Sequence, residues 1–322
     1  MMKNKFIAGI LYAFAADLVW GLAFAIPKLL GSYSALEVTL GRYFIYGIIS
    51  LLLLRCSKRE GLSWGMWRKA VLFAFCGNVG YYVLLVLAIQ LTGATIATVV
   101  IGVLPITISL YGNLLNREFA FIQVGPSLIV ILLGIIAVNY ASITGIREAA
   151  WNVYGFLSGL SALALWTWFG VANARFLRTN PQLSAVDWSS ITGVATLCLL
   201  PFFVIVSGIF SPESVAFTKI IHWESSREFW FGSLVLGAIV SWLGTAFWNR
   251  ASHILPVSLA GQLIVGETIC GLGYVFWVES RAPYFFEWIG IIMIIGGVVV
   301  GIRTINRLKG VIVDGAEQSQ SS

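Results

Sequence analysis

Ten long apolar stretches divide this chain of 322 residues, and they restrict its fold more than any other feature. A hydrocarbon core of about 30 Å requires about 20 apolar residues of helix, because backbone amides without partners are too costly in lipid. The stretches that reach this length are approximately 6–27, 36–54, 69–89, 94–115, 119–139, 153–174, 188–210, 229–248, 254–277 and 285–303. They predict an all-α integral membrane protein with ten transmembrane helices.

The composition excludes a soluble globular protein. Hydrophobic residues make up 59% of the chain and charged residues 11%, against roughly 45–50% and about 25% in soluble domains. The chain has no G-x-x-x-x-G-K-[ST] motif, which excludes a pump that hydrolyses ATP on this chain alone. Its four cysteines are widely spaced, without a C-x-x-C pair, so we expect neither a disulfide nor a metal cofactor.

The distribution of Lys and Arg between the spans predicts the orientation. With the N-terminus in the cytoplasm, 14 of the 20 basic residues fall in cytoplasmic segments and 4 fall on the opposite side. By the positive-inside rule, both termini are expected on the cytoplasmic side of an inner membrane. This bias accounts for the net charge of +6, so we expect a lipid bilayer and no nucleic acid as partner.

Similar features recur in similar order in the two halves of the chain. Leu18-Val19-Trp20-Gly21 in the first span corresponds to Leu165-Trp166-Thr167-Trp168 in the sixth. The fourth span ends in Asn116-Arg117-Glu118, and the ninth ends in Val278-Glu279-Ser280-Arg281. We therefore expect a five-helix repeat at 1–146, a second at 147–310, and a disordered, polar tail at 311–322. Because five is odd, two such units in series must have opposite orientations, which makes the repeat inverted.

In these features the chain resembles the drug/metabolite transporter superfamily, in its EamA (ten-span) branch. The resemblance runs from about Ile7 to Arg303. The matching residues are Trp20-Gly21 with Lys28 in the first span, Arg42 early in the second, Pro105 in the fourth, Glu118 before a Gly-containing fifth span, and Glu279 at the end of the ninth. One departure is Val265-Gly266-Glu267, which stands where the first half has Pro105, so the geometry of the fourth helix does not carry over to the ninth.

The resemblance implies secondary transport, often export, of amino acids or other small metabolites. The substrate site of such transporters lies near the midplane of the membrane, between the two halves. The motifs are short and specify the superfamily, not the substrate.

Two carboxylates lie about halfway through predicted spans, Asp17 in the first and Glu267 in the ninth. A charged side chain at the bilayer centre costs about 2.5–3.5 kcal/mol on insertion scales, so it is usually functional or paired. Each is a candidate to carry a coupling proton or to hold a cationic group of a substrate. The alternative for each is a structural hydrogen bond or a tight polar contact with a neighbouring helix.

Arg42, about six residues inside the second span, is a candidate to bind an anion or a carboxylate near the outer mouth, as is Lys28. The alternatives are that these side chains extend to the interface, or that Glu37 pairs with one of them and ties the first two spans together.

Aromatic side chains inside the spans are the second kind of candidate. Trp20, Tyr82, Trp166 and Trp242 are predicted to line a cavity, while most other aromatic residues serve helix packing and the membrane interfaces. Aromatic walls bind flat apolar groups by stacking and quaternary amines by cation–π attraction of about 0.5–2 kcal/mol per contact.

Two amides and a proline complete the predicted site. Asn78 and Gln262 lie within spans, where an amide can orient an amino or carboxyl group of a substrate. Gln262 precedes Glu267 by five residues, so the two side chains point about 140° apart on a helix. Pro105 is the predicted hinge, because proline frees a backbone carbonyl within a helix.

The sequence thus predicts a secondary transporter, not an enzyme, that exports small amphipathic metabolites. Amino acids, particularly aromatic ones, are the first candidates for its cargo. Protons are the candidate coupling ion, and no cofactor is expected. The alternative cargo is an organic cation held by Asp17 or Glu267 and the aromatic wall. Remoter alternatives are an intramembrane enzyme, disfavoured because His222 and His253 both fall in predicted loops, and a receptor that transports nothing.

Overall fold

The computed structural model describes residues 2–30, 32–33, 35–56, 63–117, 119–138, 140, 153–210, 223–278 and 280–320. Helices are the only regular elements in this part of the chain. In chain order they are α1 (Met2–Leu29), α2 (Ala35–Cys56), α3 (Trp64–Ala74), η1 (Phe75–Val79), α4 (Gly80–Ile101), α5 (Leu104–Asn116), α6 (Phe121–Val138), α8 (Val153–Thr179), α9 (Ala185–Phe210), α11 (Trp223–Leu234), η4 (Val235–Leu243), α12 (Gly244–Ile254), α13 (Val257–Leu263), α14 (Gly266–Val278) and α15 (Phe285–Gln320). The predicted all-α fold is confirmed for these residues. The segments η1 and η4 are π-helical turns inside longer helices.

Eight helical stretches of the described chain are long and apolar enough to cross a membrane. They are Asn4–Pro27, Leu36–Arg55, Phe121–Val138, Val153–Thr179, Ala185–Ile205, Ser226–Ile254, Val257–Val278 and Phe285–Ile305. Each coincides with a predicted span, and the predicted spans 69–89 and 94–115 have no counterpart among them. The predicted interruption between those two spans is wrong, because α4 continues through residues 90–93. The total of ten spans stays a prediction.

Two helices of the fold are broken. Residues 102–103 separate α4 from α5, and residues 264–265 separate α13 from α14, each pair in a turn. Pro105 lies in the first turn of α5, where its missing amide hydrogen costs nothing and its fixed φ suits a helix start. At the second break the amides of Glu267 and Thr268 donate to the carbonyls of Ile264 and Val265.

Backbone features of the first half recur in the second half after a nearly constant number of residues. The turns begin at positions 102 and 264, which differ by 162. The two non-glycine residues of the described chain with positive φ are Arg117 after α5 and Ser280 after α14, and their numbers differ by 163. The π-helical segments begin at Phe75 and Val235, which differ by 160. Such agreement favours two related halves, each with one π-helical segment and one broken helix. The expectation that the geometry of the fourth span does not recur in the ninth is therefore wrong, because the ninth also breaks in a turn although it lacks the proline.

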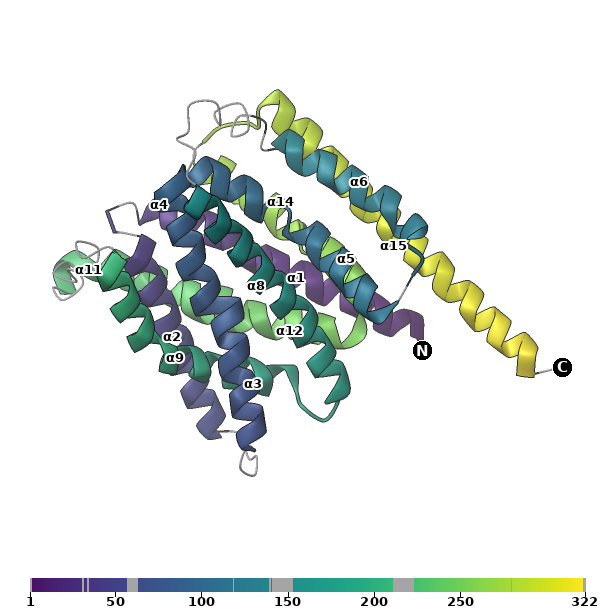
Figure 1. Ribbon diagram of the computed structural model, residues 1–322, viewed down its shortest axis with the longest axis horizontal. Helices are drawn as coiled ribbons and strands as arrows, with labels where there is room; N and C mark the ends of the chain where they lie inside the picture. Colours follow the sequence, from purple (N-terminus) through teal and green to yellow (C-terminus); the bar gives the residue numbers. More distant parts are fainter. Residues whose placement is uncertain are drawn as a thin grey trace.

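Corresponding helices of these halves pack antiparallel. Figure 1 shows α6 beside α15 with opposite chain directions. In this pair Gly290 lies against Val138, whereas Gly297, further along α15, lies against Ile131, nearer the start of α6. The same reversal relates α2 to α9. An inverted repeat requires these relations, and the repeat itself stays a prediction.

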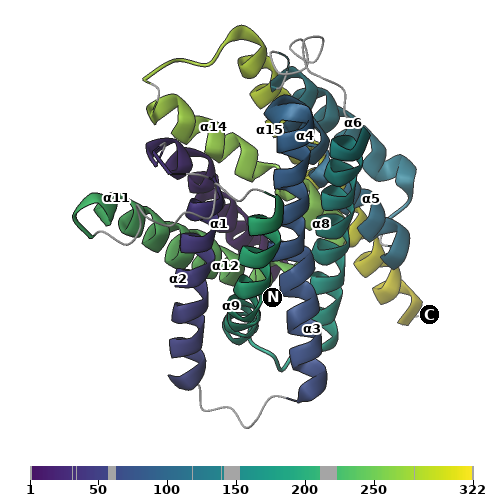
Figure 2. The ribbon, with the colours of Figure 1, turned by 60° about the vertical axis from the view of Figure 1, so that its left-hand side comes forward.

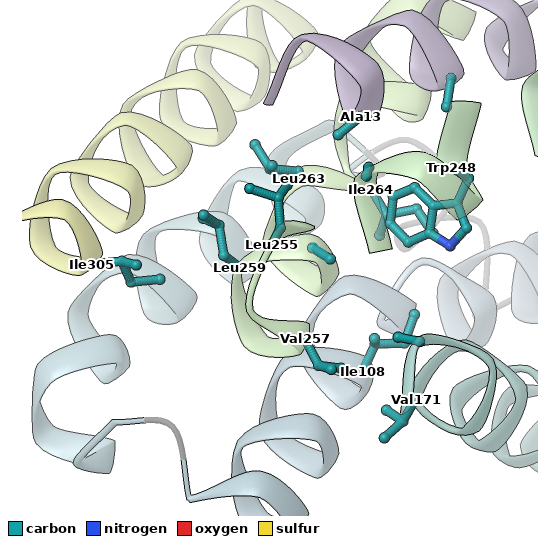
Figure 3. Close-up of a cluster of buried hydrophobic side chains, with 14 of the residues drawn as sticks. Ala13, Ile108, Val171, Trp248, Leu255, Val257, Leu259, Leu263, Ile264 and Ile305 are labelled. Carbon is teal, nitrogen blue, oxygen red and sulfur yellow. The ribbon is translucent and has the colours of Figure 1, made fainter. Parts of the chain in front are cut away.

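The short helix α13 lies at the centre of the main core, and all seven of its residues are buried. Figure 3 shows its side chains Val257, Leu259 and Leu263 among residues from α1, α5, α8, α12 and α15. Apolar side chains of the outer helices are exposed instead, as at Ile122 on α6, which is 85% exposed. This distribution suits a chain whose outer surface faces lipid.

The ends of the helices alternate between the two ends of the bundle. The end of α2 and the start of α3 lie at one end, and the end of α14 and the start of α15 lie at the other (Figure 2). Helix α15 continues to Gln320 and thus includes 311–320, for which the sequence predicts a disordered tail. Glu118 and Glu279, which carry part of the resemblance, lie outside the described residues.

The broken helices cross where Gly261 of α13 meets Ser109 of α5. A Cβ atom at Gly261 would lie 2.7 Å from the amide nitrogen of Ser109 and 2.9 Å from its Cα. The Ser109 hydroxyl donates to the carbonyl of Ser258 at 2.8 Å, so α13 is also bonded to α5 at this crossing. Only glycine allows two backbones to approach this closely.

We expect Gly261→Ala to destabilise the protein by about 1–3 kcal/mol, because the new methyl group would press on backbone atoms that cannot turn aside. Thermal unfolding of the purified protein in detergent measures the effect. Gly273→Ala on α14 is the matched control, because nothing lies within 4 Å of a Cβ atom there. Equal unfolding temperatures for the two variants would contradict the tight crossing.

Candidate functional site

Asp17 of α1 lies against the start of α14. Any side chain at Gly266 would collide with the Asp17 carboxylate, so the glycine makes room for it. Asp17 is only 2% exposed, and its Oδ1 has no hydrogen-bond partner among the described residues. The first amides of a helix carry partial positive charge, which stabilises a nearby carboxylate. The broken helix therefore creates a setting in which a buried acid is tolerated.

The same two helices stay in close contact beyond Asp17. A Cβ atom at Gly21 would lie 2.8 Å from the amide nitrogen of Gly271, and the Tyr274 hydroxyl donates to the Leu18 carbonyl at 3.1 Å. Helices α1 and α14 belong to different predicted halves, so this contact connects the halves directly beside the carboxylates.

Glu267, in the first turn of α14, is the second carboxylate of the site. It interacts electrostatically with both Asp17 and Arg42. Its side chain is partly accessible, and within the described chain it makes no hydrogen bond and no ion pair within 4 Å. A carboxylate in this state is free to accept a proton or the ammonium group of a ligand.

Arg42 of α2 supplies the opposite charge. Its Nε donates to Oγ of Ser241 in η4 at 2.7 Å, and its guanidinium carbon lies 5.5 Å from the centre of the Tyr43 ring. Its two terminal nitrogens donate to no acceptor in the described residues. The partly accessible guanidinium therefore keeps a pair of donors free, the geometry that binds a carboxylate through two parallel hydrogen bonds.

Aromatic side chains of α4 and α8 adjoin these charges. Tyr81 interacts electrostatically with both Glu267 and Arg42, and its ring lies 6.3 Å from that of Trp166 on α8. Tyr82 is hydrogen-bonded to Thr39 and also lies within electrostatic range of Arg42. The structure thus brings five elements, α1, α2, α4, η4 and α14, to one cluster of charges and phenol rings, with α8 beside it.

Two further predicted residues lie next to this cluster, in the π-helical segments. Asn78 of η1 donates to the hydroxyl of Thr196 on α9 at 2.8 Å. Trp242 of η4 donates to the hydroxyl of Ser190 at 3.0 Å and packs in the same apolar cluster as Tyr82. A π-helical turn in a longer helix is frequent at functional sites, so both segments are features of interest in their own right.

Two predicted residues lie elsewhere. Trp20 packs against Gly244 and its ring lies 5.3 Å from that of Trp248, so it fills the interface between α1 and α12. Gln262 is completely buried, accepts a hydrogen bond from Ser127 at 3.2 Å and lies against Gly301. Gln262 therefore ties α13 to α6 and α15 and lies outside the cluster around Glu267.

A buried polar network beside the site was not predicted from the sequence. Trp188 donates to Asn173 at 2.7 Å, Asn173 to Asn249 at 2.9 Å, and Asn249 to Ser189 at 2.9 Å. The Tyr46 hydroxyl donates to the Ser189 carbonyl at 2.8 Å and so connects α2 to α8, α9 and α12. The criterion that selected Asn78, an amide inside a span, would also have selected Asn173, whereas Asn249 lies just beyond the predicted span 229–248.

Ser241 was missed for a different reason. A serine in an apolar span carries no charge and fits a helix interior, so nothing in the sequence distinguishes it. Its importance depends on Arg42, which is 199 residues away in the chain.

Comparisons with known proteins agree with this architecture. A family model described as the EamA-like transporter family matches residues 7–140. The inner membrane protein YtfF of Escherichia coli (strain K12) is 32% identical over 318 residues, which cover 92% of this chain and 95% of YtfF. A solved structure titled only "Crystal structure of protein" matches with a TM-score of 0.74 and covers 93% of this chain and 98% of its own, and at 18% identity it shows a shared fold.

The fold and the comparisons together define a multi-pass helical membrane transporter. The chain belongs to the EamA-like transporter family, within the drug/metabolite transporter superfamily. The predicted resemblance is therefore confirmed.

The different surroundings of Glu267 and Gln262 predict different access from water. In a cysteine-free background, we expect Glu267→Cys to react with a water-soluble thiol reagent and Gln262→Cys to stay unmodified, because Gln262 is completely buried. Mass spectrometry of the labelled protein in membranes measures the modified fraction. Equal labelling at the two positions would exclude the proposed access to Glu267.

Proposed function

We propose that this protein is a secondary active transporter of the inner membrane that exports small amphipathic metabolites. Amino acids, particularly aromatic ones, are the first candidates for its cargo. The observation that carries the proposal is the pair formed by Glu267 and Arg42, two opposite charges that act on each other without an ion pair within 4 Å. A zwitterion carries the complementary charges. Its ammonium group would bind at Glu267 and its carboxylate at Arg42.

The rings beside the charges support an aromatic side chain on the cargo. Tyr81, Tyr82 and Trp166 offer faces and edges for an aromatic ring, and such contacts contribute about 0.5–1.5 kcal/mol beyond apolar burial. Trp242 and Asn78 extend the same wall through the π-helical segments. Trp20 and Gln262 have helix-packing roles in this proposal.

Asp17 is the proposed coupling group. It is buried next to a second carboxylate, and one of its oxygens has no hydrogen-bond partner among the described residues. A proton taken up by this pair removes the repulsion between two like charges in a low-dielectric environment. Proton entry from one side and release to the other would then be coupled to substrate movement in the opposite direction.

Alternating access is the proposed mechanism, with the two halves moving about the site. The turns at 102–103 and 264–265 are the proposed hinges, and Pro105 lies in the first turn of the helix that follows the first of them. In this proposal the N- and C-termini both lie in the cytoplasm, as the positive-inside rule requires for an even number of spans.

An organic cation is the alternative cargo. The observation that favours it is the excess of negative charge, with two carboxylates beside one guanidinium group. Aromatic rings near a carboxylate also bind quaternary amines well.

Flux into proteoliposomes decides between these cargoes. We expect a pH gradient to stimulate the flux of an aromatic amino acid in the wild type, and we expect this stimulation to disappear in Asp17→Asn, because an amide cannot take up the proton. Labelled amino acids and choline-like cations are measured with and without the gradient.

Asp187→Asn is the matched control, since this carboxylate lies at the start of α9 and bonds to Ser184. Flux of a choline-like cation alone, lost in Asp17→Asn, would replace the amino acid by the alternative cargo. Gradient-stimulated amino-acid flux that persists in Asp17→Asn would remove Asp17 from the coupling mechanism.

A further inference from the structure

The two π-helical segments make corresponding hydrogen bonds to the opposite half of the protein. Asn78 in η1 donates to Thr196 of α9, and Ser241 in η4 accepts from Arg42 of α2. Positions 78 and 241 differ by 163, as do the left-handed residues Arg117 and Ser280. Asn78 is the fourth residue of η1 and Ser241 the seventh of the longer η4, and each joins a π-helical segment to a helix of the other half.

The two bonds differ in charge. Thr196 is completely buried, and its bond with Asn78 joins two neutral groups. Ser241 is 4% exposed, and its bond holds one edge of a guanidinium group whose other nitrogens stay free in the described chain. The bond in η1 thus joins two neutral groups, whereas the bond in η4 holds a charged group of the site.

The bond from Nε determines how Arg42 can meet a ligand. A guanidinium group is planar, so a bond at Nε fixes the plane and the direction of its two terminal nitrogens. These nitrogens form the fork that matches the two oxygens of a carboxylate. The π-helical turn of η4 supplies the hydroxyl at this place, since the inserted residue of such a turn changes which side chains face a neighbouring helix.

We propose that Ser241 is a positioning residue that holds Arg42 in the orientation that binds the carboxylate of the substrate. The inference rests on the proposed function and deepens it, because it makes a carboxylate the group that this half of the site recognises. A compound with a carboxylate and no ammonium group then still binds at Arg42, whereas an amine without a carboxylate does not depend on Ser241.

Three related compounds separate these contributions. Phenylalanine has both groups, N-acetylphenylalanine has the carboxylate alone, and phenethylamine has the ammonium group alone. Binding of each to the purified full-length protein in lipid nanodiscs is measured by calorimetry. For Ser241→Ala we expect Kd to rise about three- to tenfold for the two carboxylates, which matches the net contribution of one typical hydrogen bond, and to stay within about twofold for phenethylamine.

Ser158→Ala is the matched control, because it also removes a serine hydroxyl, one that donates to the Tyr154 carbonyl within its own helix α8. We expect this variant to bind all three compounds like the wild type. If Ser241→Ala binds none of them, Arg42→Lys decides, since lysine keeps the charge and lacks the Nε–H group. A loss confined to the carboxylates supports the proposal, and an equal loss for all three compounds overturns it.

The remaining outcomes distinguish this inference from the proposed function. Binding of N-acetylphenylalanine that depends on Ser241, together with no flux of phenylalanine, supports the role of Ser241 and removes amino acids as cargo. Flux of phenylalanine with unchanged carboxylate binding in Ser241→Ala overturns the inference and leaves the proposed function in place. No binding of either carboxylate to the wild type overturns the inference as well.

Discussion

A helix that breaks inside a membrane leaves backbone amides and carbonyls that lipid cannot satisfy, and the rest of this structure depends on how those groups are covered. The chain breaks twice, between α4 and α5 and between α13 and α14. Helix α13 is completely buried among five other helices, and Gly261 lets it approach the backbone of α5. The helices with large exposed apolar surfaces, such as α6, lie outside this centre, where they face lipid.

The same breaks explain why charges are tolerated near the middle of the protein. Asp17 lies where α14 begins, and Glu267 lies in its first turn, so both benefit from the partial positive charge of the helix start. Arg42 acts on Glu267 and is bound to Ser241 instead of being neutralised in an ion pair. Charges that lack close partners in a low-dielectric interior are costly to the fold, and they are the groups best able to recognise a polar solute. The proposed function rests on these charges.

Much of the fold follows from elementary patterns in the sequence. Eight of the predicted spans coincide with membrane-length helices, because the length of an apolar stretch directly reflects the thickness of the bilayer. The region around residues 64–116 was harder, since the boundary predicted at residues 90–93 falls inside the continuous helix α4. Charge identified Asp17, Arg42 and Glu267. Gln262 and Glu267 lie apart because a turn at 264–265 separates α13 from α14, and not because of their spacing on one continuous helix. Ser241, Asn173 and Asn249 gain their roles from partners far away in the chain, which no local pattern reveals.

The sequence by itself determined that this protein is embedded in lipid, that it is helical, where most of its spans lie and which charged residues lie inside them. Those properties depend on transfer free energies, which are summed over neighbouring residues and can be evaluated one stretch at a time. Only the tertiary structure decided which of the polar residues meet, which of them pack between helices, and where the helices break. These outcomes depend on crossings between segments more than a hundred residues apart, where a few ångströms of backbone approach at Gly21 or Gly261 decide which side chains come together.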